Sequence, residues 1–230
     1  MSKEIITLDR IDVTFQQKKR QIQAVKDVSI RINQGDIYGI VGYSGAGKST
    51  LVRVINLLQV PTGGTITVDN DVIFKDKRVQ LSAAQLRQKR QDIGMIFQDP
   101  LSSLNPLHRI GKQIEEALIY HTELSAEERQ KRVIELLTQV GIPNPERCAK
   151  QYPHELSGGM RQRVMIAMAM SCKPSVLIAD EPTTALDVTI QAQILDLIKG
   201  LQAEMHAGII LITHDLGVVA ETADRVAVMY

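Results

Sequence analysis

A glycine-rich segment at residues 42–50 constrains the fold of this 230-residue chain more than any other feature. It reads Gly-Tyr-Ser-Gly-Ala-Gly-Lys-Ser-Thr and fits the pattern G-x-x-x-x-G-K-[ST], and the apolar run Ile37–Val41 before it predicts a buried strand. In that context the segment is a phosphate-binding loop, because glycines let successive N–H groups point at phosphate oxygens from the N-terminus of the following helix. The alternative is a glycine-rich turn that binds nothing, but such a turn does not explain the pair Lys48-Ser49.

The loop supplies the first group of candidate ligand contacts. Lys48 provides a positive charge for the outer phosphates, and the Ser49 hydroxyl provides a ligand for Mg²⁺. The candidate contacts of the loop are Gly42, Ser44, Gly45, Ala46, Gly47, Lys48, Ser49 and Thr50.

The composition is that of an ordinary globular protein, with 44% hydrophobic and 23% charged residues. Lys and Arg total 27 against 26 for Asp and Glu, so the net charge of +1 predicts no nucleic-acid partner and no electrostatic attraction to lipid. No apolar stretch approaches the roughly 18 residues of a membrane span, and the first ten residues lack a signal-peptide pattern. We therefore expect a cytoplasmic chain, with Cys148 and Cys172 as packing residues.

The first hundred residues read as strands around the loop. Alternating apolar positions in 5–15 and 25–32 predict two antiparallel strands, joined by a solvated basic turn at Lys18-Lys19-Arg20. A helix is predicted at about 48–58, and further strands at 65–68 and 93–97.

From Asp99 to about Ser171 the pattern predicts helices separated by Pro and Gly. Within this segment, Ser125 to Glu128 is a capping box that opens a helix. Strand patterns return at 175–179, 209–213 and 225–230, with helices between them. The sequence thus predicts an α/β fold, with a mainly parallel sheet, helices on its faces and an inserted helical subdomain.

Two acids end the apolar run that begins at Val176, which places Asp180 and Glu181 at the carboxyl edge of the sheet, where open α/β sheets bind ligands. Asp180 suits Mg²⁺ through water. Glu181 is placed to polarise the water that attacks a γ-phosphate, a role typically worth about 10²–10⁴ in rate. The alternative is a strand end marked by acidic turn residues.

The segment Leu156–Met160 reads LSGGM and precedes an apolar helix, with Ser157 at the N-cap position. Two glycines in the first turn of a helix lower its stability by about 1 kcal/mol each relative to Ala. This cost is explained if the glycines let the backbone approach an anion closely. This segment resembles the LSGGQ signature of ATP-binding cassette (ABC) ATPases, with Met160 in place of Gln. By this resemblance, the candidate nucleotide contacts here are Ser157, Gly158 and Gly159.

The remaining motifs of that family follow in chain order. Phe15 resembles the aromatic residue under adenine, Gln98 the Q-loop glutamine that touches Mg²⁺ and the attacking water, and His214 the switch histidine beside the γ-phosphate. Each has a plainer interpretation, as a strand-end core residue, a solvated loop residue and a structural histidine, respectively. Ala185-Leu186-Asp187 resembles the D-loop, although Asp187 also fits the N-cap of the next helix.

The resemblance covers essentially the whole chain and implies a P-loop NTPase with a core of 1–98 and 172–230, including an N-terminal antiparallel β-subdomain, and a helical subdomain of 99–171. It also implies ATP and Mg²⁺ as ligands, a second cassette stacked head to tail, and location at the inner face of the cell membrane. The expected partners there are transmembrane permease subunits and, indirectly, an extracytoplasmic substrate-binding protein.

Two branches of the family are represented. Residues 1–97 resemble the methionine-importer ATPase, whereas motifs from Asp99 onward, such as Asp99–Pro106 and Ala179–Thr189, resemble oligopeptide, dipeptide and nickel importers. We interpret this as a recombinant, natural or engineered, that is joined near Met95–Gln98 and serves a peptide-type permease. The alternatives are an ordinary single-lineage cassette, a methionine importer, or a cassette that binds ATP without coupling to a native permease. Because the chain ends at Tyr230, we expect no regulation by the C-terminal extension usual in both branches.

Rival classes explain less of the sequence. A P-loop kinase or GTPase leaves Leu156–Met160 and His214 unexplained, and the guanine-reading Asn-Lys-x-Asp motif is missing. DNA-repair cassettes need a long coiled-coil insertion, and ribosome-binding ones carry two cassettes. A module that binds ATP without turnover stays open.

Overall fold

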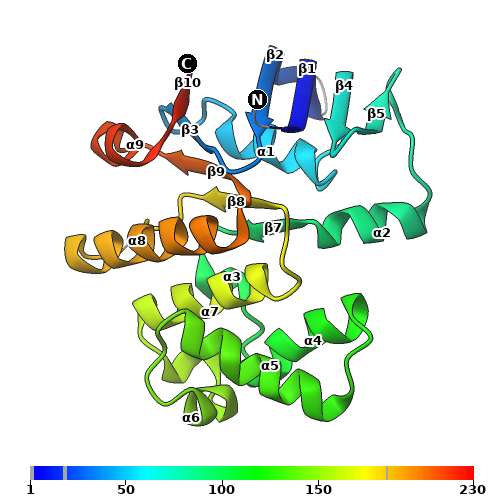
Figure 1. Ribbon diagram of the computed structural model, residues 1–230. Helices are drawn as coiled ribbons and strands as arrows, with labels where there is room; N and C mark the ends of the chain where they lie inside the picture. Colours follow the sequence, from blue (N-terminus) through cyan, green and yellow to red (C-terminus); the bar gives the residue numbers. More distant parts are fainter. Residues whose placement is uncertain (1–2, 18–19, 185) are drawn as a thin grey trace.

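Two five-stranded sheets carry the fold (Figure 1). The computed structural model describes residues 3–17, 20–184 and 186–230. The first sheet is parallel throughout, in the order β10-β3-β9-β8-β7. Its strands are β3 (Ile37–Gly42), β7 (Ile93–Ile96), β8 (Val176–Asp180), β9 (Gly208–Thr213) and β10 (Arg225–Met229).

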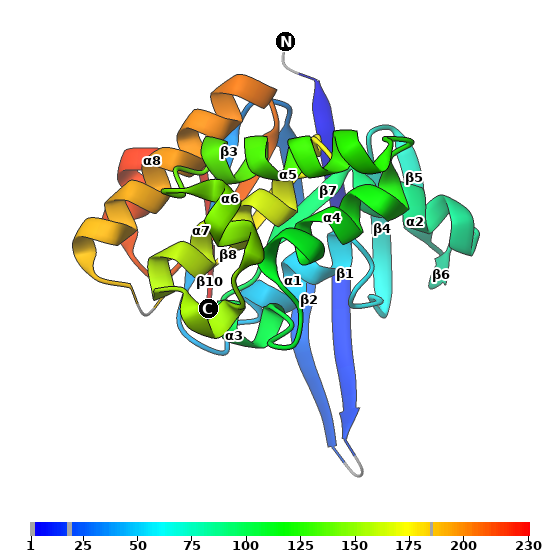
Figure 2. The ribbon, with the colours of Figure 1, turned by 90° about the horizontal axis from the view of Figure 1, so that it is seen from below.

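The second sheet is antiparallel, in the order β2-β1-β4-β5-β6. Its strands are β1 (Glu4–Gln17), β2 (Arg20–Asn33), β4 (Gly63–Val68), β5 (Asp71–Lys75) and β6 (Arg78–Val79). The paired ends of β1 and β2 form a long hairpin that projects from the body of the molecule (Figure 2). The predicted basic turn of this hairpin includes Lys18 and Lys19, which lie outside the described residues.

Helix α1 (Lys48–Ile55) packs between the two sheets. Ile11 of β1, Leu51 of α1 and Ile212 of β9 belong to one buried cluster, so the phosphate loop is anchored in the core that joins the sheets. The helix ends at Ile55 and not at 58 as predicted, because Leu57 adopts a left-handed conformation (φ 53°). The α-helix cannot continue through such a residue.

The remaining helices surround the parallel sheet or form a layer beside it (Figures 1 and 2). They are α2 (Ala83–Gln91), α3 (Pro100–Ser103), α4 (Ile110–His121), α5 (Ala126–Gln139), α6 (Pro145–Lys150), the 3-10 turn η1 (Pro153–Glu155), α7 (Gly158–Met170), α8 (Val188–Met205) and α9 (Leu216–Thr222). Helix α5 begins with the predicted capping box, in which the Ser125 hydroxyl accepts from the Glu128 N–H and the Glu128 carboxylate accepts from the Ser125 N–H.

A second buried cluster unites the helical layer with the other face of the parallel sheet. It runs from Leu118 of α4 and Leu137 of α5 through Leu177 of β8 to Ile198 of α8. The predicted boundaries of the helical subdomain at 99 and 171 are therefore crossed by continuous packing, and the division of the chain stays a prediction.

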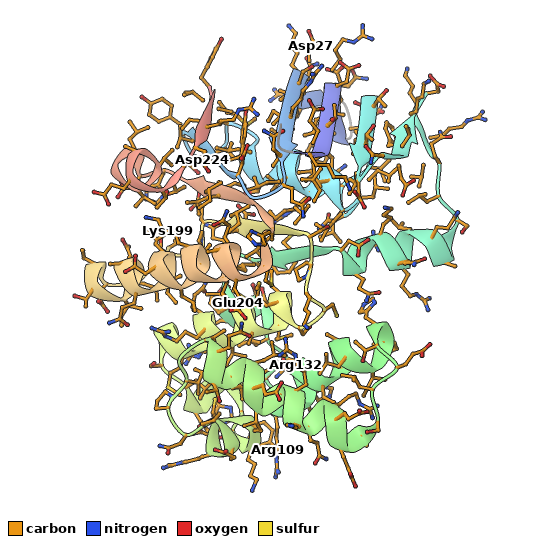
Figure 3. All side chains as sticks on the ribbon, in the orientation of Figure 1. Asp27, Arg109, Arg132, Lys199, Glu204 and Asp224 are labelled. Atoms are coloured by element: carbon orange, nitrogen blue, oxygen red, sulfur yellow. The ribbon has the colours of Figure 1, made fainter. Side chains whose placement is uncertain are left out.

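The predicted fold class is confirmed: a mainly parallel sheet flanked by helices, with an antiparallel β-subdomain at the N-terminus. Asp224, labelled in Figure 3, fixes the start of β3, since its Oδ2 accepts from the Ile37 N–H at 2.8 Å. None of the helices in the described ranges is both long and apolar enough to cross a membrane.

Candidate active site

The phosphate loop connects β3 to α1, and two of its glycines are required by close backbone approaches. A Cβ on Gly47 would lie 2.1 Å from the Ala24 carbonyl oxygen of β2, and a Cβ on Gly42 would lie 2.2 Å from the Met229 carbonyl oxygen. Gly47 is also left-handed (φ 88°), a conformation that glycine adopts without a steric penalty. The neighbouring strands therefore set the shape of the loop.

Lys48 is held inside this loop with only 5% of its surface exposed. Its ammonium donates hydrogen bonds to the carbonyl oxygens of Gly42 (2.8 Å) and Tyr43 (3.0 Å). The ammonium also lies 3.8 Å from Glu181 Oε1. The buried ammonium of Lys48 therefore lies between the loop and the acidic residues at the end of β8.

Asp180 is the last residue of β8 and is fully buried. Its Oδ1 accepts from the Ser49 hydroxyl at 2.8 Å, whereas its Oδ2 has no hydrogen-bond partner and lies 3.7 Å from the Arg53 guanidinium. Burial raises the pKa of Asp180, and the Ser49 hydrogen bond and the charge of Arg53 counteract this only in part. Burial therefore makes the charged form of this carboxylate less favourable than it would be in water.

Asp180→Asn is expected to stabilise the nucleotide-free protein. Since the pKa of Asp180 is raised in the folded state, the folded chain binds the proton more strongly, and the free energy of unfolding falls as pH rises through that raised pKa. Removing the charge should raise the free energy of unfolding near pH 7, on the order of 1 kcal/mol, because a neutral amide is less costly to bury than a carboxylate. Denaturant unfolding should show this gain, with the exposed Asp196→Asn as control. Lower stability of Asp180→Asn at pH 7 would contradict the burial argument.

Glu181 follows β8 in a left-handed conformation (φ 48°), which costs a residue with a Cβ roughly 1–2 kcal/mol. Its N–H donates to the Ile212 carbonyl of β9 at 3.1 Å. Its Oε2 accepts two hydrogen bonds of 3.0 Å, from Gln98 Nε2 and from the Thr184 hydroxyl. Backbone strain at a carboxylate held in this way is typical of functional sites.

The predicted motif residues Gln98 and His214 approach Glu181 from the ends of two other strands. Gln98 follows β7, and His214 follows β9 with its Nδ1 3.7 Å from Glu181 Oε2. The His214 side chain is 68% exposed, so it has room to move. Parallel strands place all of these groups at one edge of the sheet.

These elements surround a cavity of about 380 Å³. The residues that line it are Ala24, Ser44, Gly45, Gly47, Lys48, Ser49, Thr50, Gln98, Glu181 and His214. The structure thus brings together nine of the predicted site residues. Gly42, Ala46 and Asp180 are not among the residues that line the cavity. Phe15 is not part of the lining and packs partly against the core that joins the sheets.

The glycines after Ser157 lie outside this cavity, at the N-terminus of α7. The Ser157 hydroxyl accepts from the Met160 N–H at 3.3 Å, so the predicted N-cap is confirmed. A Cβ on Gly159 would lie 3.0 Å from Ile190 of α8, whereas one on Gly158 would meet Leu186 at an ordinary 3.6 Å. Ser157 and Gly158 are exposed and open to a ligand or partner from outside the chain.

Asp187 caps α8, because its Oδ1 accepts from the Ile190 N–H at 3.0 Å. This confirms the plainer of its two interpretations and leaves the D-loop interpretation as a prediction. Ala185, within that motif, lies outside the described residues.

The cavity edge has the donor set of a magnesium site that is completed by phosphates. Across the described ranges, no three His, Cys, Asp or Glu side chains gather to hold a metal unaided. Mg²⁺ is, however, usually bound through one or two carboxylates together with substrate phosphates and water. The Ser49 hydroxyl and the buried Asp180, with its unpartnered Oδ2, fit that arrangement, and the Gln98 amide lines the same cavity.

Sequence patterns missed three contributors to this site. Ala24 reaches the loop through the packing of β2, for which the sequence gives no signal. Arg53 lies one helical turn after Ser49, so helical periodicity could have placed it near Asp180. Thr184 lies three residues after Glu181, close enough for a side chain to bond back across a turn.

A larger hollow of about 500 Å³ lies away from this site, between α5 and the end of α8, near Arg132 and Glu204 (Figure 3). Its polar side chains bond to one another: Arg132 lies 3.4 Å from Glu135, and Gln139 donates to Glu204 at 2.8 Å. We assign it no ligand.

Comparison with known proteins gave consistent matches. Residues 25–184 match the family model described as ABC transporter. Methionine import ATP-binding proteins MetN from Streptococcus pyogenes and Streptococcus pneumoniae are each 55% identical, over 230 and 232 aligned residues, and cover 100% of this chain. The chain spans 63% of the length of these two relatives.

Among solved structures, the fold matches a dimeric post-hydrolysis state of the ATP-binding cassette MJ0796 bound to ADP and Pi. The TM-score is 0.87 at 34% identity, over 98% of this chain and 94% of the other.

Proposed function

This chain belongs to the ABC transporter family, and on that basis we propose that it binds and hydrolyses ATP to drive an importer. The observation that carries the proposal is the cavity lined by Lys48, Ser49 and Glu181, in which Ser49 is hydrogen-bonded to the buried Asp180. A phosphate chain fits there, because loop amides, a helix N-terminus and an ammonium all offer positive charge.

In this proposal the phosphate-loop residues hold the triphosphate. The Lys48 ammonium, now bonded to two loop carbonyls, would bind phosphate oxygens. Ser49, Asp180 and Gln98 would hold Mg²⁺, which would neutralise charge on the outer phosphates. Phe15 remains the proposed adenine contact. This contact would require the adenine ring to extend beyond the cavity described above.

Glu181 is the proposed general base. Its Oε2 is occupied by Gln98 and Thr184, and among the described residues Oε1 accepts no hydrogen bond. Oε1 can therefore accept the proton of a water molecule that attacks the γ-phosphate. His214, exposed at the rim and 3.7 Å from Oε2, is proposed to contact the γ-phosphate once ATP is bound.

We further propose that a second cassette completes the site. Ser157, Gly158 and Gly159 begin α7 outside the cavity of their own chain, so in a head-to-tail pair they would face the nucleotide of the partner. The dimeric state of the matched cassette bound to ADP and Pi supports this arrangement.

For the cargo, the comparisons favour the alternative of the sequence analysis. The MetN relatives are 55% identical over the whole chain, including the part after residue 99 that suggested peptide and nickel importers. They lend no support to a recombinant of two branches. We therefore propose a methionine importer, with permease subunits that place the cassette at the inner face of the membrane.

The test of this function is co-expression with either a methionine-type or a peptide-type permease. The methionine-type permease should co-purify with the chain and raise its rate of phosphate release from MgATP, measured with a coupled assay. Stable capture by the peptide-type permease alone would reverse the assignment of cargo. Purified chain that neither binds MgATP in calorimetry nor releases phosphate would refute the ATPase proposal itself.

A further inference from the structure

The hydroxyl of Thr184 points to a positioning role in ATP hydrolysis that the sequence motifs do not assign. We propose that it fixes the Glu181 carboxylate so that Oε1 is the oxygen presented to the attacking water. This inference rests on the proposed function, since it gives Glu181 the role of general base. Thr184 acts through Glu181: it is not itself one of the residues that line the cavity, and in this proposal it does not touch the nucleotide.

The contact itself is direct. Thr184 Oγ1 donates to Glu181 Oε2 at 3.0 Å, in a partly buried environment. A hydrogen bond to a carboxylate is about twice as strong as one between neutral groups. The same oxygen accepts from Gln98 Nε2, also at 3.0 Å, so both donors are on one side of the carboxylate. The other side faces Lys48 Nζ at 3.8 Å.

The backbone makes Thr184 the more permanent of the two donors. The Thr184 N–H donates to the Glu181 carbonyl at 3.2 Å, which closes a turn of four residues. Glu181 is itself fixed by its left-handed conformation and by the bond from its N–H to Ile212. Within this turn, a three-residue separation holds the hydroxyl against the carboxylate.

Gln98 and His214 are held less tightly to Glu181. Gln98 belongs to a different strand end, 83 residues away in the chain, and its bond to Glu181 is exposed. The His214 ring, at 3.7 Å and 68% exposed, is beyond hydrogen-bond distance. If Gln98 turns toward Mg²⁺, Thr184 is the donor that stays on Oε2.

The test compares two variants of Thr184. Thr184→Val keeps the shape of the side chain and removes the donor, so kcat for ATP should fall by about tenfold, as expected when a charge-assisted hydrogen bond is lost. The Kd for ATP, measured by calorimetry, should stay within about twofold, because Thr184 does not line the cavity. Thr184→Ser restores the hydroxyl and should recover most of kcat.

Thr183→Val is the matched control, since it makes the same chemical change one residue earlier. In the described part of the chain the Thr183 hydroxyl makes no hydrogen bond, and only its carbonyl is used, by Leu186 and Gln191. Its kcat should equal that of the unmodified chain.

Three outcomes would overturn the inference: unchanged kcat in Thr184→Val, no recovery in Thr184→Ser, or an equal loss in Thr183→Val. Each presupposes that the unmodified chain hydrolyses ATP. An inactive unmodified chain would instead remove the proposed function, so the two failures are distinguishable. Circular dichroism melting of all variants separates misfolding from loss of positioning.

Discussion

Glu181→Gln is expected to lower the rate of ATP hydrolysis by about 10²- to 10⁴-fold, the usual contribution of a general base. Glutamine keeps the size of the side chain and can still accept at one oxygen from Gln98 or Thr184, which both reach Oε2 at 3.0 Å. It cannot take a proton from water. ATP binding should persist, because Lys48 and the loop are unchanged.

Two measurements are needed for this variant. Phosphate release reports the loss of turnover, and size-exclusion chromatography with MgATP should show a dimer that accumulates because the nucleotide is no longer cleaved. Glu221→Gln, on the exposed face of α9, is the control and should behave as the unmodified chain. A Glu181→Gln variant with full turnover would exclude Glu181 as the base. Lost turnover without accumulation of a dimer would leave the base in place and exclude ATP-driven pairing of two copies.

Gly47→Ala is expected to abolish tight ATP binding and to destabilise the fold. The new methyl group would lie 2.1 Å from the Ala24 carbonyl, and backbone cannot yield as the end of a flexible side chain can. The left-handed conformation costs roughly 1–2 kcal/mol and overpacking typically another 1–3 kcal/mol, so the free energy of unfolding should fall by about 2–5 kcal/mol. Because the loop must move away from β2, its amides would no longer converge on one phosphate.

Gly45→Ala provides the comparison for Gly47→Ala. Gly45 has nearly the same backbone angle (φ 86° against 88°), but a Cβ there would meet nothing within 4 Å. The free energy of unfolding of this variant should fall only by the cost of the left-handed conformation, roughly 1–2 kcal/mol. Denaturant unfolding and calorimetric titration with ATP measure both effects. Equal losses in the two variants would show that contact with β2 does not shape the loop.

The strongly patterned elements of the fold were predictable from sequence. Apolar alternation identified β1 and β2, and apolar runs identified β3, β8 and β9, because buried strands need such residues on one or both faces. The segment 71–91 was not predicted. Strand β6 has two residues, both exposed, and α2 has no buried residue, so neither carries a hydrophobic period.

Much of the candidate site was also predictable, for a topological reason. Gln98, Glu181 and His214 each follow a parallel strand, and parallel strands end at one edge. What sequence could not supply is the packing between sheets that brings Ala24 to the loop, and the turn that directs Thr184 back to Glu181. Both depend on atomic positions that no motif encodes.

The assignment of cargo shows the limit of reading motifs piece by piece. The segments after Asp99 contain shared site residues such as Asp180, Glu181 and Asp187, whose types are dictated by phosphate chemistry and helix capping. Such segments carry little information on which permease a cassette serves. The 55% identity to the MetN relative is counted over the full chain, and it therefore includes the surface positions. For this reason we base the proposed cargo on that identity.

The contact between Gly159 and Ile190 affects how the start of α7 can be probed by mutation. A methyl group on Gly159 would lie only 3.0 Å from the Ile190 side chain, so α7 or Ile190 would have to shift by a few tenths of an ångström. Loss of activity in a Gly159 variant could then come from this shift, and it would not show that a nucleotide reaches that backbone. The adjacent Gly158 has an ordinary 3.6 Å clearance from Leu186 and tolerates a methyl group sterically. Crosslinking or substitution aimed at a partner copy is therefore best directed to Gly158 and to Ser157, whose side chain is exposed.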